Sequence, residues 1–257
     1  MGKIIALANQ KGGVAKTTST YNLAAKKASD GKRVLMLDLD PQASLTIAAG
    51  IEPGSDELDG MSTCNLFDKK TDPLACCFSA EASGLQKLYI VPSDLQLAVT
   101  ERDLTSGRNS DVQLRMATQK LRDRFDYIFI DCPPQLGTLL TNALTAADEV
   151  LVPVKTDYLA YRGLKALMDT IEGVKSGDGD RSLNPDLRFI GVIATLYKKS
   201  SNDHKEILAL LEKNYKVFGV VSDTVVTNKG VVNGRPVVIA EPSSDVAKVY
   251  MQIADAI

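Results

Sequence analysis

Short apolar runs alternate along this chain with longer segments in which apolar positions recur at helical spacing. Most of the runs are rich in Ile, Val and Leu at consecutive positions, which is typical of parallel strands that are buried on both faces. Strands that alternate with helices predict βαβ units, and therefore an α/β three-layer sandwich with a mostly parallel sheet and helices on both faces. Strands are expected at residues 4–8, 34–37, 88–91, 127–130, 150–154 and 189–194, and helices at residues 17–29, 112–124 and 159–174.

Two segments between these elements have the character of surface insertions. Residues 52–60 are acidic and rich in turn formers, and residues 176–186 have no hydrophobic periodicity. The chain has no internal repeat and no shift in composition that marks a domain boundary. Because α/β folds often reach about 250 residues as one unit, we expect a single domain over residues 1–257.

Composition and charge narrow the classes of function. Hydrophobic residues make up 44% of the chain and charged residues 24%, as in ordinary folded proteins. The 30 Lys and Arg against 32 Asp and Glu give a net charge of −2, so any contact with nucleic acid must be local or conditional. No apolar stretch approaches the ~20 residues that span a bilayer, and the N-terminus has no signal-peptide layout. We expect a soluble, intracellular protein.

The cysteines give no sign of a metal or disulfide framework. Cys64, Cys76, Cys77 and Cys132 form no C-x-x-C pair, and the single histidine, His204, supplies no zinc-ligand spacing. Reduced and mostly buried thiols are expected.

The most informative segment is residues 9–18, NQKGGVAKTT, between the first strand and the first helix. A strand, a glycine-rich turn and a helix N-terminus together direct backbone N–H groups and the helix dipole at one place. Gly12 and Gly13 let the main chain curl around a phosphate, Lys16 is expected to neutralise β- and γ-phosphate charge, and the Thr17 hydroxyl to bind Mg²⁺. The flanking elements disfavour the alternative, a glycine turn with a solvated lysine.

This loop departs from the general pattern G-x-x-x-x-G-K-[ST] at two positions. Gln10 replaces the first glycine and Ala15 the last, and Lys11 adds a second lysine that one subunit does not need for cradling phosphate. The predicted nucleotide-binding residues are Lys11, Gly12, Gly13, Val14, Ala15, Lys16, Thr17 and Thr18.

Carboxylates follow two of the expected strands. Asp38 and Asp40 come after residues 34–37, at the strand end where α/β sheets bind ligands. Asp40 is expected to position or polarise a water for attack on the γ-phosphate, with Asp38 nearer the metal; an acidic strand end that caps the next helix is the alternative. Asp131 ends an apolar strand in the form of a Walker B motif and is expected to hold Mg²⁺ through a bound water. Cys132 is expected only to pack.

These motifs resemble those of a known family. The loop is similar to the deviant Walker A motif, K-G-G-x-x-K-[ST]-T, of ParA- and MinD-type ATPases, and residues 131–167 are similar to ParA/Soj partition ATPases. The likeness extends over residues 2–50 and 85–197, although Ala43 and Ser44 replace the glycine and asparagine of the family pattern D-x-D-P-Q-G-N. The resemblance implies a P-loop NTPase fold, ATP and Mg²⁺ as cofactors, ATP hydrolysis that depends on Lys11, Lys16 and Asp40, and a metal site at Thr17, Asp38 and Asp131.

The resemblance also implies partners. In this family ATP closes two subunits face to face, so Lys11 would reach the phosphates of the partner subunit. The ATP-bound homodimer binds DNA without sequence preference, and a ParB-like or small DNA-binding protein stimulates hydrolysis. We therefore expect a cytoplasmic protein that associates with the nucleoid when ATP is bound, has no membrane partner, and serves chromosome or plasmid segregation.

The DNA surface is not assigned. The I-P-R-N-V segment of the family is matched best by residues 221–225, VSDTV, where aspartate stands in place of the arginine, so its adenine and DNA roles are not transferred. Ordinary solvated surface charge is the favoured interpretation for any single one of the candidate basic residues, which are Lys198, Lys199, Lys205, Lys229 and Arg235.

Three other functions are alternatives to DNA partition. A membrane-surface positioning ATPase like MinD needs a basic amphipathic helix at the C-terminus, but residues 245–257 contain one lysine and are expected to form a helix that docks on the core. An iron–sulfur carrier needs cysteines that bridge two subunits, which the adjacent Cys76 and Cys77 do not suit. A related ATPase that positions another cargo on the nucleoid stays open.

Overall fold

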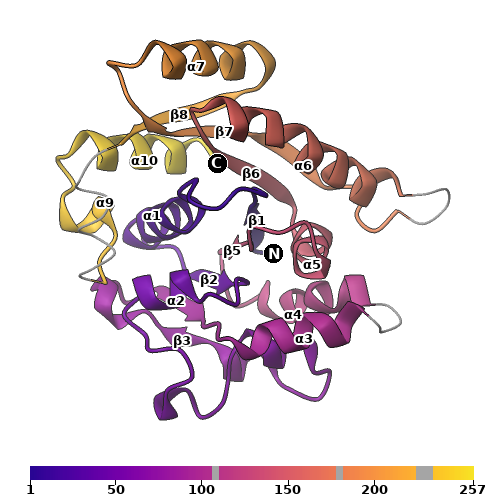
Figure 1. The fold of residues 1–257 in the computed structure, drawn as a ribbon. Coiled ribbons are helices and arrows are strands. Elements are labelled where there is room, and N and C mark those ends of the chain that lie inside the picture. The colour runs from indigo at the N-terminus through magenta and orange to yellow at the C-terminus, as the bar shows by residue number, and fades with distance from the viewer. Residues whose placement is uncertain (106–109, 178–181, 224–233) are drawn as a thin grey trace.

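A single eight-stranded sheet forms the centre of the computed structural model, which describes residues 1–105, 110–177, 182–223 and 234–257 (Figure 1). The strands are β1 (Lys3–Leu7), β2 (Val34–Asp38), β3 (Phe78–Ser79), β4 (Leu88–Val91), β5 (Tyr127–Asp131), β6 (Glu149–Lys155), β7 (Arg188–Tyr197) and β8 (Val217–Ser222). Their order is β3-β4-β2-β5-β1-β6-β7-β8, and every neighbouring pair is parallel except β3 with β4. The predicted mostly parallel sheet is confirmed.

Helices cover both faces of the sheet. Along β1, Ile4 and Ala6 belong to one apolar core, whereas Ile5 and Leu7 belong to the other. This alternation explains why the strand is apolar at every position. The helices are α1 (Lys16–Ser29), α2 (Ser44–Ala48), α3 (Gln96–Thr105), α4 (Gln113–Leu121), α5 (Thr138–Ala146), α6 (Tyr158–Ser176), α7 (Asn202–Asn214), α9 (Val237–Ala240) and α10 (Asp245–Asp255).

A different set of helices covers each face of the sheet. Helices α1, α2, α9 and α10 pack on the Ile5 side, and α3, α4, α5, α6 and α7 pack on the Ile4 side (Figure 1). The three-layer α/β sandwich expected from the sequence is thereby confirmed. Short 3₁₀ helices carry the connection between α2 and β4 and the start of α4, at Asp56–Leu58, Thr63–Phe67, Pro73–Cys76, Glu81–Ser83 and Ser110–Val112.

The C-terminal helix α10 docks on the core, as expected. Tyr250 is completely buried, and its hydroxyl lies 3.1 Å from Ser19 Oγ on α1. None of the helices in the described ranges is long and apolar enough to cross a membrane. The acidic segment at residues 52–60 contains a single 3₁₀ turn. Of the other proposed insertion, residues 178–181 lie outside the described residues.

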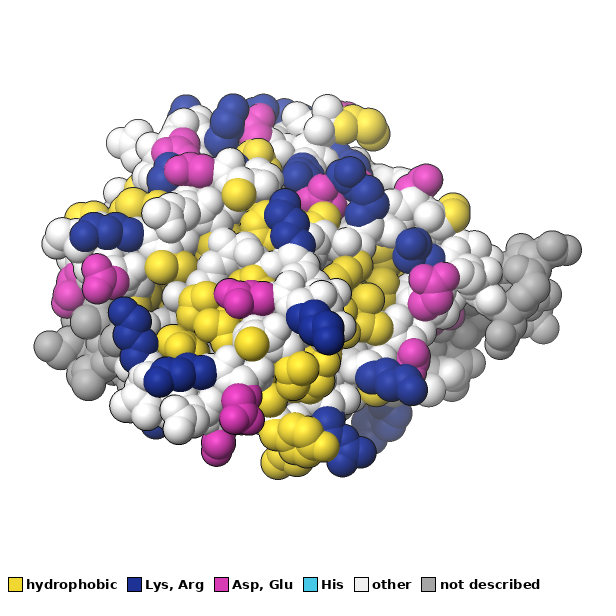
Figure 2. All heavy atoms as spheres, turned by 90° about the horizontal axis from the view of Figure 1, so that it is seen from above, with side chains coloured by type: hydrophobic (Ala, Val, Ile, Leu, Met, Phe, Trp, Pro, Cys, Tyr) yellow, Lys and Arg dark blue, Asp and Glu magenta, His cyan; other side chains and the backbone are white. Residues whose placement is uncertain are grey.

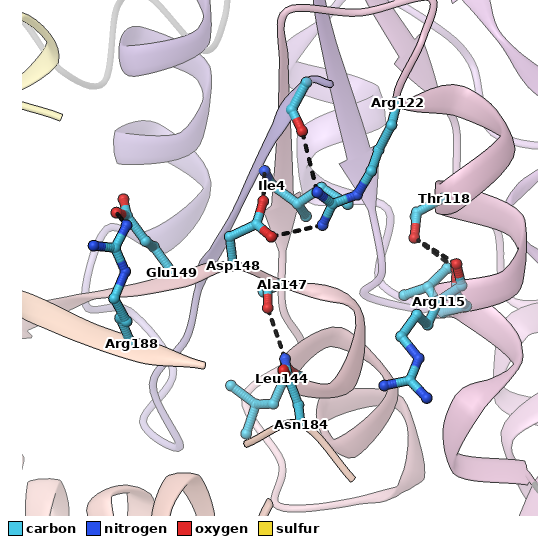
Figure 3. Close-up of polar contacts among 12 residues, drawn as sticks. Ile4, Arg115, Thr118, Arg122, Leu144, Ala147, Asp148, Glu149, Asn184 and Arg188 are labelled. Carbon is cyan, nitrogen blue, oxygen red and sulfur yellow. Dashed lines mark hydrogen bonds and ion pairs between the residues drawn. The ribbon is translucent and has the colours of Figure 1, made fainter. Parts of the chain in front are cut away.

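A polar network fastens the amino ends of the strands (Figure 3). Arg122 Nη2 contacts Asp148 Oδ1 at 2.7 Å, and the N–H of Ile4 donates to Asp148 Oδ2 at 2.7 Å. Asn184 Nδ2 donates to two carbonyls at the end of α5, at 2.9 and 2.7 Å. These contacts connect α4, β1, β6 and the segment before β7, and they leave the opposite, carboxyl edge of the sheet for ligand chemistry.

Candidate functional site

The glycine-rich loop between β1 and α1 is shaped by two residues in left-handed conformation. Gly13 has φ 67 and Ala15 has φ 63. No heavy atom lies within 4 Å of a Cβ built on Gly13, so conformation and not space favours glycine there. The Ala15 carbonyl accepts the N–H of Ser19 at 3.0 Å and so opens α1. The loop thus leads directly into the N-terminus of α1, where free N–H groups favour an anion.

Hydrogen bonds to two distant strands hold both halves of the loop. Asn9 Nδ2 donates to the carbonyl of Pro153 on β6 at 2.7 Å, and Asn9 Oδ1 accepts the N–H of Lys11 at 2.9 Å. Thr195 Oγ1, on β7, donates to the carbonyl of Val14 at 3.0 Å. The loop conformation is therefore determined by β6 and β7 as well as by its own sequence.

The two lysines of the loop lie in different surroundings. Lys16 is only 8% exposed, and its Nζ donates to the carbonyl of Lys11 at 3.1 Å. Burial lowers the pKa of Lys16, and the nearby carboxylates of Asp131 and Asp40 oppose that shift. Its ammonium is thus kept within the curl of the loop, where a phosphate would meet it. The Lys11 side chain is exposed.

Asp131 at the end of β5 is paired with the first turns of α1. Thr17 Oγ1 donates to Asp131 Oδ2 at 2.6 Å, and Thr20 Oγ1 donates to Asp131 Oδ1 at 3.3 Å. Burial and the neighbouring Asp38 raise the pKa of Asp131 to about 7, against the opposing effects of Thr17 and Lys16. A hydroxyl and a carboxylate in contact beside a buried ammonium form a donor set that suits a hydrated Mg²⁺ on a phosphate.

Asp38 lies beside Asp131, because the two residues are in register on adjacent strands. Thr46 donates to Asp38 Oδ2 through its N–H at 2.8 Å and its hydroxyl at 2.7 Å, and the N–H of Asp40 donates to Asp38 Oδ1 at 3.2 Å. Burial raises the pKa of Asp38 to about 6, although the contacts from Thr46 oppose that rise. The carboxylate therefore fixes the turn that carries Asp40.

Asp40 is half-buried and differs from the other two carboxylates in its contacts. Its Oδ1 accepts the N–H of Gln42 at 3.0 Å. A partly exposed carboxylate of this kind has access to water, which a general base requires.

The described residues contain no group of three or more His, Cys, Asp or Glu side chains that could hold a metal ion alone. A divalent cation at Thr17 and Asp131 would therefore take further oxygen ligands from water and phosphate, as Mg²⁺ commonly does. Burial raises the pKa of Cys76 to about 11 and that of Cys77 to about 12, which makes both thiols poor nucleophiles and ligands.

The structure thus places Lys16, Thr17, Asp38, Asp40 and Asp131 together at the carboxyl edge of the sheet. The candidate DNA residues are only partly described by the structure. Lys198 is paired with Asp223 at 3.3 Å, and Lys229 and the last two residues of 221–225 lie outside the described residues. On the face shown in Figure 2, Lys and Arg side chains are interspersed with Asp, Glu and apolar side chains.

Sequence reasoning missed three threonines of the site. Thr20 lies three residues after Thr17 on the same face of α1, and this spacing is a signal that could have found it. No local sequence pattern indicates the roles of Thr46 and Thr195, because tertiary folding brings each of them to its partner. Thr195 contacts a loop residue that is 181 positions away in the sequence.

Comparison with known proteins identifies the family of this chain. The family model described as an AAA domain, AAA_31, matches residues 2–189. The sporulation initiation inhibitor protein Soj of Bacillus subtilis is 37% identical over 257 residues, which cover 99% of this chain and 97% of Soj. The chromosome partitioning protein ParA of Myxococcus xanthus is 35% identical, over 98% of this chain and 87% of that protein. This chain belongs to the ParA/Soj family of partition ATPases, within the ParA/MinD superfamily.

Solved structures agree with a ParA/Soj fold. The cobyrinic acid a,c-diamide synthase of Mycobacterium smegmatis, solved with bound ADP and magnesium, has a TM-score of 0.82 and 32% identity, and the match covers 100% of this chain and 94% of that chain. An ATP complex of McdA from Cyanothece has a TM-score of 0.85 at 22% identity, over 99% of this chain and 96% of that chain, and shows the shared fold.

Proposed function

We propose that this member of the ParA/Soj family hydrolyses ATP to ADP and phosphate in a Mg²⁺-dependent reaction that serves the partition of chromosomal or plasmid DNA. The observation that carries the proposal is the contact of Thr17 with Asp131 beside the buried Lys16. The ADP and magnesium held by the mycobacterial relative support the same cofactors here. Partition is favoured over amide synthesis because the partition proteins are the more similar in sequence, at 37% and 35% against 32%.

The residues of the site fit a Mg²⁺-nucleotide. The N–H groups of the loop from Lys11 to Thr18 and the Lys16 ammonium would hold the phosphates. Thr17 would ligate Mg²⁺ directly and Asp131 through water, with Asp38 nearby. Bound Mg²⁺ would neutralise phosphate charge and keep the γ-phosphate in place for in-line attack.

Asp40 is the proposed base for the reaction. Its carboxylate would orient a water and accept its proton as the water oxygen bonds to the γ-phosphorus and the bond to ADP breaks. Asp38, which binds the N–H of Asp40, keeps this carboxylate in position. Lys16 would stabilise the charge that develops on the phosphate oxygens.

Lys11 is proposed to act between subunits. Because its side chain is exposed, it is free to reach the phosphates of a second copy, so ATP binding would be converted into dimerisation. The ATP-bound dimer would bind DNA without sequence preference on the nucleoid, and a ParB-like or small DNA-binding partner would stimulate hydrolysis. Because the monomer has a net charge of −2, its overall charge does not favour DNA, and a DNA-binding surface that forms only in the ATP-bound dimer is consistent with this charge.

The proposal is tested by phosphate release and by retention on non-specific DNA at low salt, with ATP, ADP or no nucleotide. We expect Mg²⁺-dependent hydrolysis, and retention with ATP only; Lys16→Ala should lose both, and Lys11→Ala should lose retention. A wild-type protein that ignores DNA in the presence of ATP would refute the partition role. Co-sedimentation with anionic liposomes, for which we expect no binding, distinguishes a MinD-like function.

A further inference from the structure

The phosphate loop lies directly against the first turns of α6. Gln10 Nε2 donates a hydrogen bond to the carbonyl of Gly163. A Cβ on Gly163 would lie 2.8 Å from Gln10 Nε2 and 3.5 Å from Lys11 Cε, so a larger residue there would displace the Gln10 amide. The position of Lys11 relative to α6 is therefore set by the fold of one subunit.

A second cation shares the hollow in which Lys11 lies. The hollow, of about 380 Å³, is lined by Gln10, Lys11, Leu159, Arg162 and Gly163. None of these residues is acidic, and among the described residues no carboxylate pairs with Lys11 or Arg162. The positive charge of the hollow thus has no ion-pair partner among the described residues of its own subunit.

The rim of the hollow is apolar and exposed. Leu159 is 67% exposed, and the neighbouring Tyr158 is 60% exposed. The Arg162 guanidinium carbon lies 5.8 Å from the centre of the Tyr158 ring, a contact that orients the arginine without neutralising it. Leu136, which follows β5 at the same edge of the sheet, is also exposed. An arginine among exposed aromatic and aliphatic side chains is typical of the centre of a protein interface.

We propose that Arg162 joins Lys11 in a cationic half-site for the triphosphate that a second copy of this chain holds. This inference rests on the proposed ATP-dependent dimer and adds a residue to it. Two copies that meet face to face bring two Lys11 and two Arg162 side chains into one interface, where like charges repel. Only bound nucleotide supplies the compensating charge, and the γ-phosphate supplies more of it than ADP does. Arg162 thereby makes dimerisation selective for the triphosphate.

The test separates dimerisation from nucleotide binding. Sedimentation velocity with a non-hydrolysable ATP analogue and Mg²⁺ gives the dimer dissociation constant, and a fluorescent ATP analogue at low protein concentration gives the affinity of the monomer. For Arg162→Ala we expect a dimer dissociation constant raised by about tenfold or more, with unchanged affinity of the monomer. Arg162→Lys should recover part of the loss, and Lys165→Ala, at an exposed cation on α6 outside the hollow, should behave as wild type.

Each outcome has a defined meaning. Equal dimerisation of Arg162→Ala and wild type overturns the role of Arg162, and so does a loss of affinity in the monomer, since that would place the arginine on the nucleotide of its own subunit. A wild-type protein that binds the analogue without dimerising overturns the half-site. A wild-type protein that fails to bind any nucleotide refutes the proposed ATPase function itself. Far-UV circular dichroism of each variant confirms its folding.

Discussion

Ala15 and Ala43 share the same left-handed backbone conformation, with φ 63 and φ 54, and each is the N-cap of a helix beside the site. Ala15 stands where the general pattern G-x-x-x-x-G-K-[ST] has glycine, and Ala43 stands where the family pattern D-x-D-P-Q-G-N has glycine. At both positions the chain thus has alanine in a backbone conformation that favours glycine. Because an L-residue other than glycine is strained in this region by about 1 kcal/mol or more, both turns carry strain that glycine would not.

Ala15→Gly should therefore stabilise the protein. The relief of strain, less the entropic cost of glycine, leaves a gain of up to about 1 kcal/mol, so we expect Tm to rise by up to about 3 °C in a chain of this size. Ala43→Gly is the matched control for strain outside the phosphate loop and should raise Tm similarly. Thermal unfolding followed by circular dichroism measures both, and a Tm lowered by Ala15→Gly would show that the loop is not strained.

Thr17→Ala should weaken the Mg²⁺ dependence of ATP binding. The substitution removes the hydroxyl that donates to Asp131, and loss of a contact of this kind commonly reduces metal affinity by about tenfold or more. Titration of Mg²⁺ against bound fluorescent ATP measures the effect. Thr17→Ser keeps the hydroxyl and should retain the wild-type dependence. An unchanged Mg²⁺ dependence in Thr17→Ala would rule out its ligand role.

Asp40→Ala should leave ATP binding and dimerisation intact and slow hydrolysis by about a hundredfold or more, as expected for the loss of a general base. Steady-state phosphate release gives kcat, and sedimentation velocity follows the dimer, which should persist in ATP. Asp40→Asn keeps the hydrogen-bond acceptor for the N–H of Gln42 and should be equally slow. If either variant fails to bind ATP, the assigned role is wrong.

Asp157 makes the stability of α6 depend on pH. It is the N-cap of α6: its Oδ1 accepts the N–H of Ala160 at 2.8 Å, and Lys155 Nζ lies 3.1 Å from its Oδ2. Burial alone would raise the pKa of Asp157, but these two contacts outweigh it, so the pKa is lowered. The carboxylate therefore contributes stability above its unfolded pKa of about 3.9, and this contribution is lost as pH falls through the lowered folded pKa.

Asp157→Ala should accordingly lower the free energy of unfolding by about 1 kcal/mol at neutral pH, the usual effect of losing an N-cap. Urea unfolding at decreasing pH measures the free energies of unfolding of the wild type and of Asp157→Ala. The difference between these two free energies should become smaller in the acid range. Asp157→Asn retains a neutral N-cap, so its free energy of unfolding should fall by less than that of Asp157→Ala, and the loss should change less with pH. If the difference in free energy of unfolding between the wild type and Asp157→Ala stays constant down to strongly acidic pH, the stabilisation does not come from the ionised carboxylate.

The sequence was sufficient to predict the buried strands because each is apolar on both faces, as the division of Ile4 and Ile5 between two cores shows. Strand β8 was missed, since among its residues only Val221 is buried and the apolar run is broken by Gly219. The order of the strands was not predicted, because the pairing of β1 with both β5 and β6 is decided by packing between elements that are far apart in the sequence.

The site also has a part that the sequence could predict and a part that it could not. The phosphate loop was predictable because one short segment carries its glycines, its lysines and Thr17. The partners that fix it were not, since Asn9 and Thr195 meet their acceptors only after β6 and β7 are paired with the rest of the sheet. Arg162 was missed for a similar reason: nothing in the local sequence of α6 indicates that it shares a hollow with Lys11.

The anchoring of the loop by Asn9 and Thr195 has a consequence for the kinetics of ligand capture. Because hydrogen bonds to β6 and β7 fix both halves of the phosphate loop, the loop has its binding conformation before an anion arrives. Little conformational entropy of the chain is therefore lost on binding. Capture should then be limited by diffusion and charge, and differences in affinity among nucleotides should appear in how long each one stays.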